Sequence, residues 1–555
     1  MDLETDVVVV GAGPTGLALC FLLARQGITS VLIERRETRS AHPRAHFVNT
    51  RTMELLSTWG LADEVKAQAY PGECLPFELI EMIGGDSLAT RHQLSPELVA
   101  SCAQDRVEEV FLSRVERQPE VQLLWSHAYD GHDDHGDRVV VTASRPGGEP
   151  VTVAARFLVA ADVSNSSVRQ DLGIDMVGDH DLGQVINVYF YGRLTPEDEP
   201  PPMVMLAPNY EEVPGAFICM DGDHRWCFHM NFDPATESVD DYPAERCADL
   251  IRRAAGVPAD TKIDVQSIRP WTMTAHVAAR LRVGNVFLAG DAAHAFPPTG
   301  GYGMNSGIQD AHNLAWKLAA VLQGQGGDLL LDSYEAERQP IAFFNSAQSL
   351  RNARTSRRSP ESPEVEAELD RRGTKTVRSG QLTESDPEAR GKLEMLEHAS
   401  SLGQELGFAY DQSPIVLDDG SERPDIQVHK YIPNGCPGAR APHITVGVGG
   451  VEQSILSVYD GKVSLVTLPD GAAWREAANR LAFEGLQLVT LGPEEQFDAD
   501  VSAVTARYGI TTQGAVVVRP DGHIAFRASE ASDDPDAVLG RALAVTMGRA
   551  SATTP

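Results

Sequence analysis

A strand that runs directly into a glycine-rich turn and a helix constrains this chain more than any other feature. Residues 6–10 are β-branched and apolar after the first residue, as in a buried parallel strand. The glycines Gly11, Gly13 and Gly16 follow, and residues 17–26 have the apolar pattern of a helix. Residues 30–33 predict the next strand. This order predicts a βαβ unit of Rossmann-like topology.

The chemistry of this turn indicates a dinucleotide. Glycines at these spacings allow the tight turn and let the backbone approach a pyrophosphate, which the N-terminus of the helix then attracts. Glu34 closes the second strand, where a carboxylate accepts hydrogen bonds from a ribose. The motif alone does not distinguish NAD from FAD.

A second strand tip favours FAD. An apolar strand at residues 286–289 ends in Gly290 and Asp291, and a Pro/Gly loop and a helix over residues 308–322 follow. We expect Asp291 to accept hydrogen bonds from the ribityl hydroxyls of a flavin. We expect the loop to frame the flavin ring through Pro298, Gly301, Gly303, Met304 and Asn305. The structural alternative is a glycine-rich turn before an amphipathic helix.

Charge and cysteine usage limit the possible partners and location. The net charge of −32 argues against nucleic acids and anionic membranes, which repel such a surface. The seven cysteines are scattered without a C-x-x-C pair, so neither a disulfide framework nor a zinc site is expected. No apolar run reaches the length of a membrane span and no signal peptide is evident, which predicts a cytoplasmic protein.

The pattern of elements divides the chain into four segments. Residues 1–182 and 276–405 are assigned to a cofactor-binding domain and a helical connector, interrupted by an antiparallel sheet domain at residues 183–275. Residues 406–555 hold a small α/β domain. Residues 355–390, rich in Ser, Pro, Glu and Arg, are expected to form a surface loop. The segment His132 to His135 is interpreted as a hairpin tip and not as a metal site.

Several motifs together resemble one family. GAGPTG, GDAAHAFPPTGGYGMN and IQDAHNLAWKLA are similar to the class A flavoprotein monooxygenases of the para-hydroxybenzoate hydroxylase type. The likeness is to the branch of phenol, chlorophenol and aromatic polyketide hydroxylases that carry a thioredoxin-like C-terminal domain, which implies a role in secondary metabolism. The resemblance implies an α/β fold with a Rossmann-like FAD domain, an antiparallel substrate sheet, a helical connector and that C-terminal domain, whose redox cysteines are absent here.

The resemblance also implies site residues. Arg35, Arg44, Gln104 and Asp162 are expected to contact FAD, with Arg44 also placed to meet the nicotinamide cofactor. The family has glycine after the aspartate, whereas Val163 stands here, and a β-branched residue disfavours positive φ. The substitution therefore raises the question of how the reductant approaches.

The reaction implied is hydroxylation of a phenolic or polyketide-type aromatic with FAD, NADH or NADPH, and O2, through a flavin C4a-hydroperoxide. His46 is the candidate base for the phenol, and Pro298 is expected beside the reacting flavin carbon. His46 can equally well serve only as a hydrogen-bond partner of its loop. The wall of the substrate site is predicted from aromatic and apolar residues of the sheet domain, namely Tyr189, Phe217, Trp226, Trp271 and Met273.

Two other functions fit the same residues. One is Baeyer–Villiger or ring-rearranging oxygenation of a polyketide. The other is a flavoprotein that no longer uses a reductant and acts as an assembly partner, for which Val163 is the only support. A homo-oligomer, a dimer or larger, is expected for the protein whichever of these functions it has.

Overall fold

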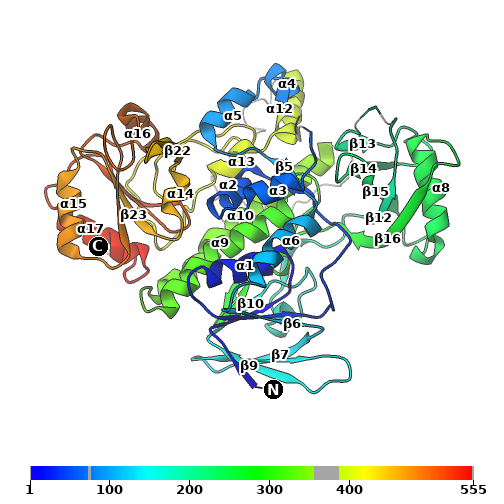
Figure 1. Ribbon diagram of the computed structural model, residues 1–555, viewed down its shortest axis with the longest axis horizontal. Coiled ribbons are helices and arrows are strands. Elements are labelled where there is room, and N and C mark those ends of the chain that lie inside the picture. The colour runs from blue at the N-terminus through cyan, green and yellow to red at the C-terminus, as the bar shows by residue number, and fades with distance from the viewer. Residues whose placement is uncertain are drawn as a thin grey trace.

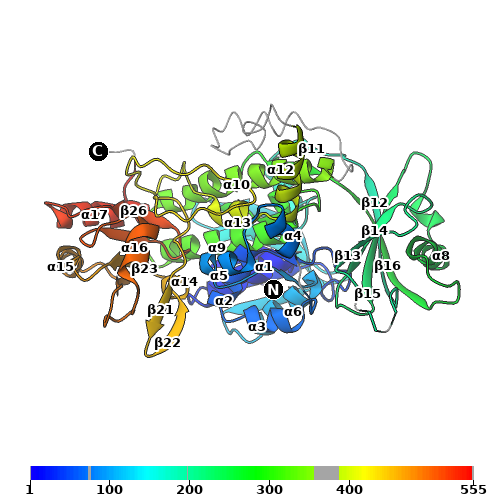
Figure 2. The same cartoon turned by 90° about the horizontal axis from the view of Figure 1, so that it is seen from above.

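The computed structural model describes residues 2–72, 75, 77–196, 198–199, 201–355 and 387–552. Figures 1 and 2 show three bodies in a row. A central body lies between an antiparallel sheet, which packs against α8 (Ala244–Ala255), and the C-terminal domain. The predicted surface loop lies almost wholly outside the described residues. None of the described helices is long and apolar enough to cross a membrane.

The central body is built on a six-stranded sheet. Four neighbouring pairs are parallel and the edge pair β18–β19 is antiparallel. In spatial order its strands are β18 (Arg282–Val283), β19 (Val286–Leu288), β10 (Phe157–Ala160), β2 (Val7–Val10), β3 (Ser30–Glu34) and β6 (Val121–Trp125). The strands β2, β3, β10 and β19 are buried along their whole length, as expected for a sheet covered on both faces.

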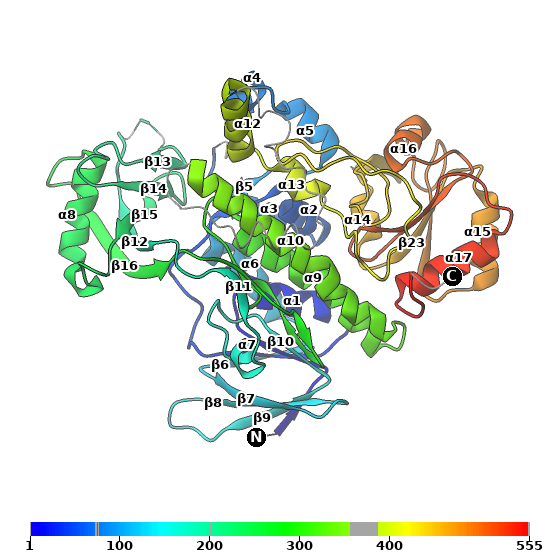
Figure 3. The same cartoon turned by 180° about the vertical axis from the view of Figure 1, so that it is seen from behind.

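Helices cover one face of this sheet and a second sheet covers the other. The helices include α1 (Pro14–Ala24), α6 (Gln104–Val115), α9 (Tyr302–Leu322) and α10 (Asp328–Thr355), of which α9 and α10 cross the middle of the molecule in Figure 3. The second sheet has the order β1 (Asp2–Glu4), β9 (Val151–Ala155), β8 (Val139–Ser144) and β7 (Ala128–Asp134). Valines of β8 and β9 complete the apolar core against β2 and β10.

Shorter elements surround this core. They are β4 (Phe47–Val48), β5 (Ala100–Ser101), α2 (Thr50–Thr58), α3 (Ala62–Ala67), α4 (Phe77–Met82), α5 (Leu88–Leu94), α7 (Ser167–Asp171), β11 (Met176–Asp179), β17 (Ala275–Ala278), β20 (His294–Ala295), α12 (Pro387–Ala399) and α13 (Leu402–Gly407). Two of them matter for the site. β4 leads into α2, and β20 precedes the loop to α9.

The predicted antiparallel sheet domain is present. Its strand order is β13 (Val204–Leu206), β14 (Gly215–Cys219), β15 (Arg225–Phe232), β12 (Gln184–Gly192) and β16 (Ile263–Thr272). Apolar side chains of one face, including Ile186, Val188 and Phe190, pack with Cys247 and Ile251 of α8. Since side chains alternate along a strand, the other face is formed by the intervening residues.

The C-terminal domain has a thioredoxin-like order. Its sheet runs β24 (Leu486–Thr490), β23 (Val463–Thr467), β25 (Ala515–Val518) and β26 (Ile524–Ala528). The first two strands are parallel and the remaining pairs antiparallel. The helices are α14 (Leu456–Tyr459), α15 (Ala472–Leu481), α16 (Val501–Tyr508) and α17 (Pro535–Thr546), and a hairpin of β21 (Thr445–Val448) and β22 (Val451–Ser454) lies at its edge. The predicted fold class is therefore correct, while the domain boundaries at residues 182, 275 and 405 stay predictions.

Candidate active site

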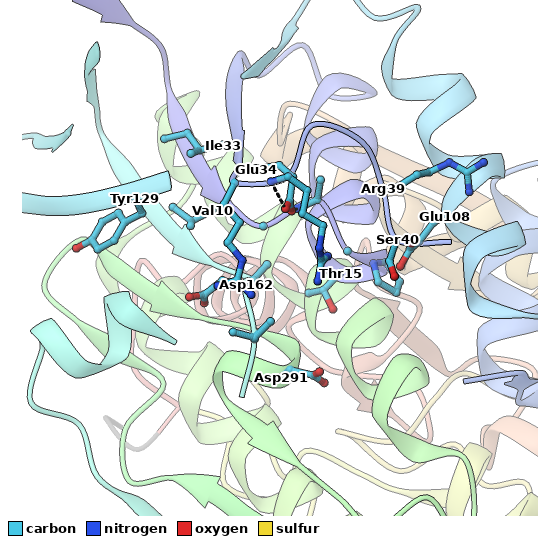
Figure 4. Close-up of a pocket in the computed structure, with 18 of the residues that line it drawn as sticks. Val10, Thr15, Ile33, Glu34, Arg39, Ser40, Glu108, Tyr129, Asp162 and Asp291 are labelled. Carbon is cyan, nitrogen blue, oxygen red and sulfur yellow. Dashed lines mark hydrogen bonds between the residues drawn. The ribbon is translucent and has the colours of Figure 1, made fainter. Parts of the chain in front are cut away.

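A deep cleft lies where the central sheet meets the N-termini of α1 and α9. It holds about 1220 Å³ of space, including its opening to solvent. Figure 4 shows side chains from β2, β3, the end of β10 and the segment before α9 turned toward it. The residues predicted from the sequence that line it are Gly11, Gly13, Glu34, Arg35, Arg44, Gln104, Asp162, Asp291, Gly303 and Met304.

The three glycines of the first turn serve two purposes. Gly11 has φ +108°, and a Cβ there would lie 2.4 Å from the carbonyl oxygen of Ala161. A Cβ at Gly16 would lie 2.0 Å from the carbonyl oxygen of Gly11. Both are therefore required by the protein's own packing. Gly13 has no atom within 4 Å of its would-be Cβ and lines the cleft, so its missing side chain leaves room for a ligand.

Glu34 organises the turn as well as facing the cleft. Its Oε2 accepts a hydrogen bond from the backbone N–H of Ala12 at 3.0 Å, and its Oε1 accepts one from Arg36 at 2.9 Å. Each carboxylate oxygen has a second lone pair, so the acid can still accept a hydroxyl from a ligand.

Asp291 stands on the opposite wall of the cleft. It belongs to a short 3-10 turn, Gly290–Ala292, and its side chain is exposed to the cleft. The surrounding protein raises the pKa of its carboxyl, and nearby Arg44 opposes that effect. A carboxyl without a protein partner at this place is suited to accept hydroxyl groups.

A buried network fixes the position of this turn. Asp310 of α9 accepts the backbone N–H of Gly290 at 3.1 Å and lies 2.7 Å from His294 Nε2 through the same oxygen. Its other oxygen accepts from Arg338 Nε at 2.7 Å. Burial raises the pKa of Asp310, but His294 and Arg338 together lower it below its usual value. The ionised carboxylate therefore ties the strand tip to α9.

The loop before α9 is shaped mainly by contacts within the protein. Gly301 caps α9 in the left-handed conformation, and a Cβ there would lie 2.8 Å from Phe47. Asn305 donates to the carbonyls of Phe47 and Gly301 and accepts from the N–H of Asn49. The Asn305 amide thus ties α9 to the start of α2, and contact of Asn305 with the cofactor stays a prediction. Pro298 lies in the same loop but outside the lining of the cleft.

The cleft also contains residues that the sequence did not reveal. Glu108 lies one helical turn after Gln104 on α6, accepts its Nε2 at 2.8 Å and faces the cleft beside Arg39 and Arg44. Burial raises the pKa of Glu108 to about 7. The i,i+4 spacing of Gln104 and Glu108 was a readable signal. Further lining residues not anticipated are Thr15, Arg36, Ser40, His127, Tyr129, Asn165 and Ser167.

The segment after β10 accommodates Val163 without a positive φ, as expected for a β-branched residue. Among described residues other than glycine, positive φ occurs at Ser126, Ala482 and Glu494, so Val163 has an ordinary backbone conformation. Its side chain lines the cleft next to Asp162. Burial raises the pKa of Asp162, whose Oδ2 accepts the N–H of Ser167 while Oδ1 is buried without a partner in the protein.

The predicted substrate residues divide between the two faces of the antiparallel sheet. Phe217 and Trp226 are fully buried on the α8 face, where their rings pack edge to face. Their assignment to the substrate wall was wrong, because strand register turns them away from the cleft. Tyr189 lies on the other face, and Trp271 and Met273 pack with Phe296, in the segment between Asp291 and α9.

His46 does not line the cleft, although it lies just before β4. Its Nδ1 is 2.9 Å from Ser101 Oγ, and burial lowers its pKa to about 4. The imidazole is therefore neutral near neutral pH, with Nε2 left for another partner.

Comparisons with known proteins identify this architecture. Residues 4–348 match a family described as FAD binding domain, and residues 434–550 match aromatic-ring hydroxylase, C-terminal. The chain is 35% identical to aklavinone 12-hydroxylase RdmE of Streptomyces purpurascens, covering 96% of this chain and 97% of the relative.

Solved structures agree with this assignment. The flavin-dependent monooxygenase PieE, solved with FAD and substrate, superposes with a TM-score of 0.83 at 27% identity, covering 98% of this chain and 99% of that chain. Aklavinone-11 hydroxylase, solved with FAD and aklavinone, superposes with a TM-score of 0.79 at 30% identity, covering 99% of each chain. The chain belongs to the FAD-dependent aromatic monooxygenases.

The cleft fits the cofactor of this family. Gly13 and Gly303 both line the cleft, and no protein atom lies within 4 Å of where their Cβ atoms would be. A side chain at either position would occupy space that is open to the cofactor. Glu34 and Asp291 provide hydroxyl acceptors at two separate places, and the arginines Arg36, Arg39 and Arg44 provide positive charge for a diphosphate. These donors and acceptors are those that an extended FAD molecule requires.

Proposed function

We propose that this enzyme hydroxylates a polycyclic aromatic of the polyketide type, consuming NADPH or NADH and O2. The observation that carries the proposal is similarity along the whole chain to enzymes named for aklavinone, both in sequence and in a complex with FAD and aklavinone. The antiparallel sheet supports it, because its free face is turned toward the domain that holds the cleft.

The cofactor residues have separate roles in this proposal. Gly13 and the N-terminus of α1 receive the diphosphate, and Glu34 accepts hydroxyls of the adenosine ribose. Asp291 accepts ribityl hydroxyls, and Gly303 and Met304 lie where the N-terminus of α9 meets the flavin ring. The chemistry that bound FAD would supply is acceptance of a hydride from the nicotinamide cofactor and activation of O2 for transfer of one oxygen atom.

The remaining residues orient the substrate and exclude water. We infer that Tyr189, Trp271 and Met273 form part of the substrate wall, with Pro298 at its edge over the ring. His46 is retained as the base for the phenol. Its neutral imidazole, held through Nδ1 by Ser101, has Nε2 available to accept a proton.

A direct assay tests the proposed substrate class. Purified holoenzyme is mixed with NADPH and aklavinone, and NADPH oxidation, O2 uptake and product mass are recorded. Product that contains one added oxygen on an aromatic ring carbon supports the proposal. A lactone identified by NMR would indicate the Baeyer–Villiger alternative. Failure to reduce the flavin with either nicotinamide, whatever aromatic is added, would favour the assembly-partner alternative.

A second assay tests His46. If His46 is the base, H46Q lowers kcat, and the acidic limb of the pH profile that its pKa of about 4 produces disappears. Since the neutral imidazole is the active form of a base, activity that depends on His46 is lost as pH falls below the pKa of His46. The variant S101A serves as a control, because it removes the Nδ1 partner and leaves Nε2 in place. Unchanged kcat in H46Q would exclude the role.

Location and assembly are also proposed. Six cysteines among the described residues are unpaired and buried, as is usual in a reducing compartment, and we infer a cytoplasmic homo-oligomer without nucleic-acid partners. Light scattering of the purified holoenzyme measures the oligomeric state.

A further inference from the structure

The free face of the antiparallel sheet rests on the wall of the FAD cleft. Cys227 Sγ lies 3.9 Å from the carbonyl oxygen of Pro43, and His42 Nδ1 lies 2.5 Å from Ser267 Oγ of β16. Residues 39, 40 and 44 of the same loop line the cleft. The loop is therefore held between the sheet and the cofactor site.

A buried ion pair joins the two bodies beside this loop. Arg225 of β15 donates through Nη2 to Asp105 Oδ2 on α6 at 2.7 Å, and the two side chains are 5% and 11% exposed. Arg225 Nε also donates to the hydroxyl of Tyr189 at 2.7 Å, and that hydroxyl donates to Tyr191 at 2.9 Å. The guanidinium carbon lies 5.2 Å from the centre of the Tyr189 ring. The sheet thus presents a fixed cation to α6.

Asp105 connects this cation to the cleft. It follows Gln104, which lines the cleft, and its carbonyl oxygen accepts from Nη1 of Arg39, another lining residue. Its Oδ1 is buried without a partner in the protein, and its Oδ2 is paired closely with Arg225 and more distantly, at 3.9 Å, with the exposed Arg106. Breaking such a pair on one side leaves a buried charge unpaired and is costly, which makes the spacing between β15 and α6 rigid.

We propose that the Arg225–Asp105 pair is a positioning device that braces the cleft wall and keeps water from the bound flavin. Arg225 and Asp105 are positioning residues in this proposal, because they act through Gln104, Arg39 and the loop at residues 39–44. The inference rests on FAD binding by the family and is independent of the proposed polyketide substrate.

Iodide quenching of FAD fluorescence in the holoenzyme tests the proposal, because it measures solvent access to the flavin without any substrate. In R225M and D105N the quenching constant is expected to rise toward that of free FAD, and H2O2 release during NADPH oxidation without substrate is expected to increase. The matched control is R193M, which removes the Arg193–Asp223 pair at 2.6 Å. Its partners are 44% and 49% exposed, respectively, and lie just after β12 and just before β15.

A merely structural role gives a different result. It lowers yield and melting temperature but leaves the quenching constant of folded, FAD-saturated protein at the wild-type value, and that outcome would overturn the proposal. If the single variants do not fold, the double variant R225M/D105L leaves no buried charge unpaired and is measured instead. A wild-type quenching constant in the double variant also overturns the proposal, and a raised constant supports it.

Discussion

Arg519 of the C-terminal domain donates to Glu337 of α10 through both terminal nitrogens of its guanidinium, with Nη1 2.6 Å from Oε1 and Nη2 2.9 Å from Oε2. Lys317 of α9 lies 2.6 Å from the same carboxylate, and all three side chains are fully buried. Burial raises the pKa of Glu337, yet the two cations lower it to about 2. The C-terminal domain is thus bound to the helices of the FAD domain by charged groups buried from solvent.

Removing one member of this cluster should destabilise the whole protein. We expect R519L to lower the free energy of unfolding by about 3–5 kcal/mol, because Glu337 then keeps only Lys317 as a buried cation. Urea unfolding followed by tryptophan fluorescence measures the change. R480A, which breaks an exposed pair with Asp536, should leave the midpoint unchanged. Equal losses in the two variants would contradict the argument.

Two neighbouring glycines should respond differently to alanine. In G13A the new methyl enters open space in the cleft, so we expect FAD retention to fall while the melting temperature of the apoprotein stays near wild type. In G16A the methyl would lie 2.0 Å from the carbonyl oxygen of Gly11, so the fold itself should be destabilised. Absorbance of bound FAD after gel filtration, with thermal unfolding of the apoprotein, separates the outcomes. Full FAD occupancy in G13A would contradict the role of Gly13.

Glu108 should make FAD binding depend on pH. Burial raises the pKa of Glu108 to about 7. From the pH at which a free carboxyl ionises up to about pH 7, the folded protein therefore keeps Glu108 protonated while the unfolded chain does not. Above that value an anion forms beside the site of the FAD diphosphate, and affinity for FAD should fall. Stability of the apoprotein should likewise decrease as pH rises through this window, because the folded state binds more protons than the unfolded state.

The variant E108Q isolates this effect, because it keeps the partner of Gln104 and removes the titration. Fluorescence titration of apoprotein with FAD between pH 6 and about 9 should show a flatter dependence in E108Q than in wild type. Parallel curves for the two proteins would assign the pH dependence to another group.

Replacing Val163 by glycine should not change the rate at which NADPH reduces the flavin. Its backbone is not in the left-handed region, so V163G removes no strain and restores no conformation that the valine forbids. We expect the rate of flavin bleaching by NADPH in stopped-flow experiments to be unchanged. A large acceleration in V163G would show that the side chain itself obstructs the reductant.

How much the sequence could predict depended on whether a feature is local. The turn at Gly11 and the tip at Asp291 were readable because each lies within one strand–turn–helix segment. Phe217 and Trp226 were misassigned because only the strand register and the position of α8 show which face of their strands is covered. The helix α9 begins six residues before the predicted Ile308, because left-handed Gly301 caps it at Tyr302. The Arg225–Asp105 pair joins residues 120 apart, a relation that no local pattern contains.

The central sheet combines strands from two distant parts of the chain, so it cannot be completed until the later strands have been synthesised. Its strand β10 has β2 on one side and β19 on the other, and the cleft needs both Gly13 and Met304. A ribosome adding about 5–20 residues per second delivers Met304 about 15–60 s after the first residue. The nascent N-terminal segment must therefore wait, with apolar strand edges uncovered, while the intervening sheet domain emerges. Cofactor availability at that moment, and chaperones that cover the edge of β10 until β19 arrives, should govern how much holoenzyme a cell obtains.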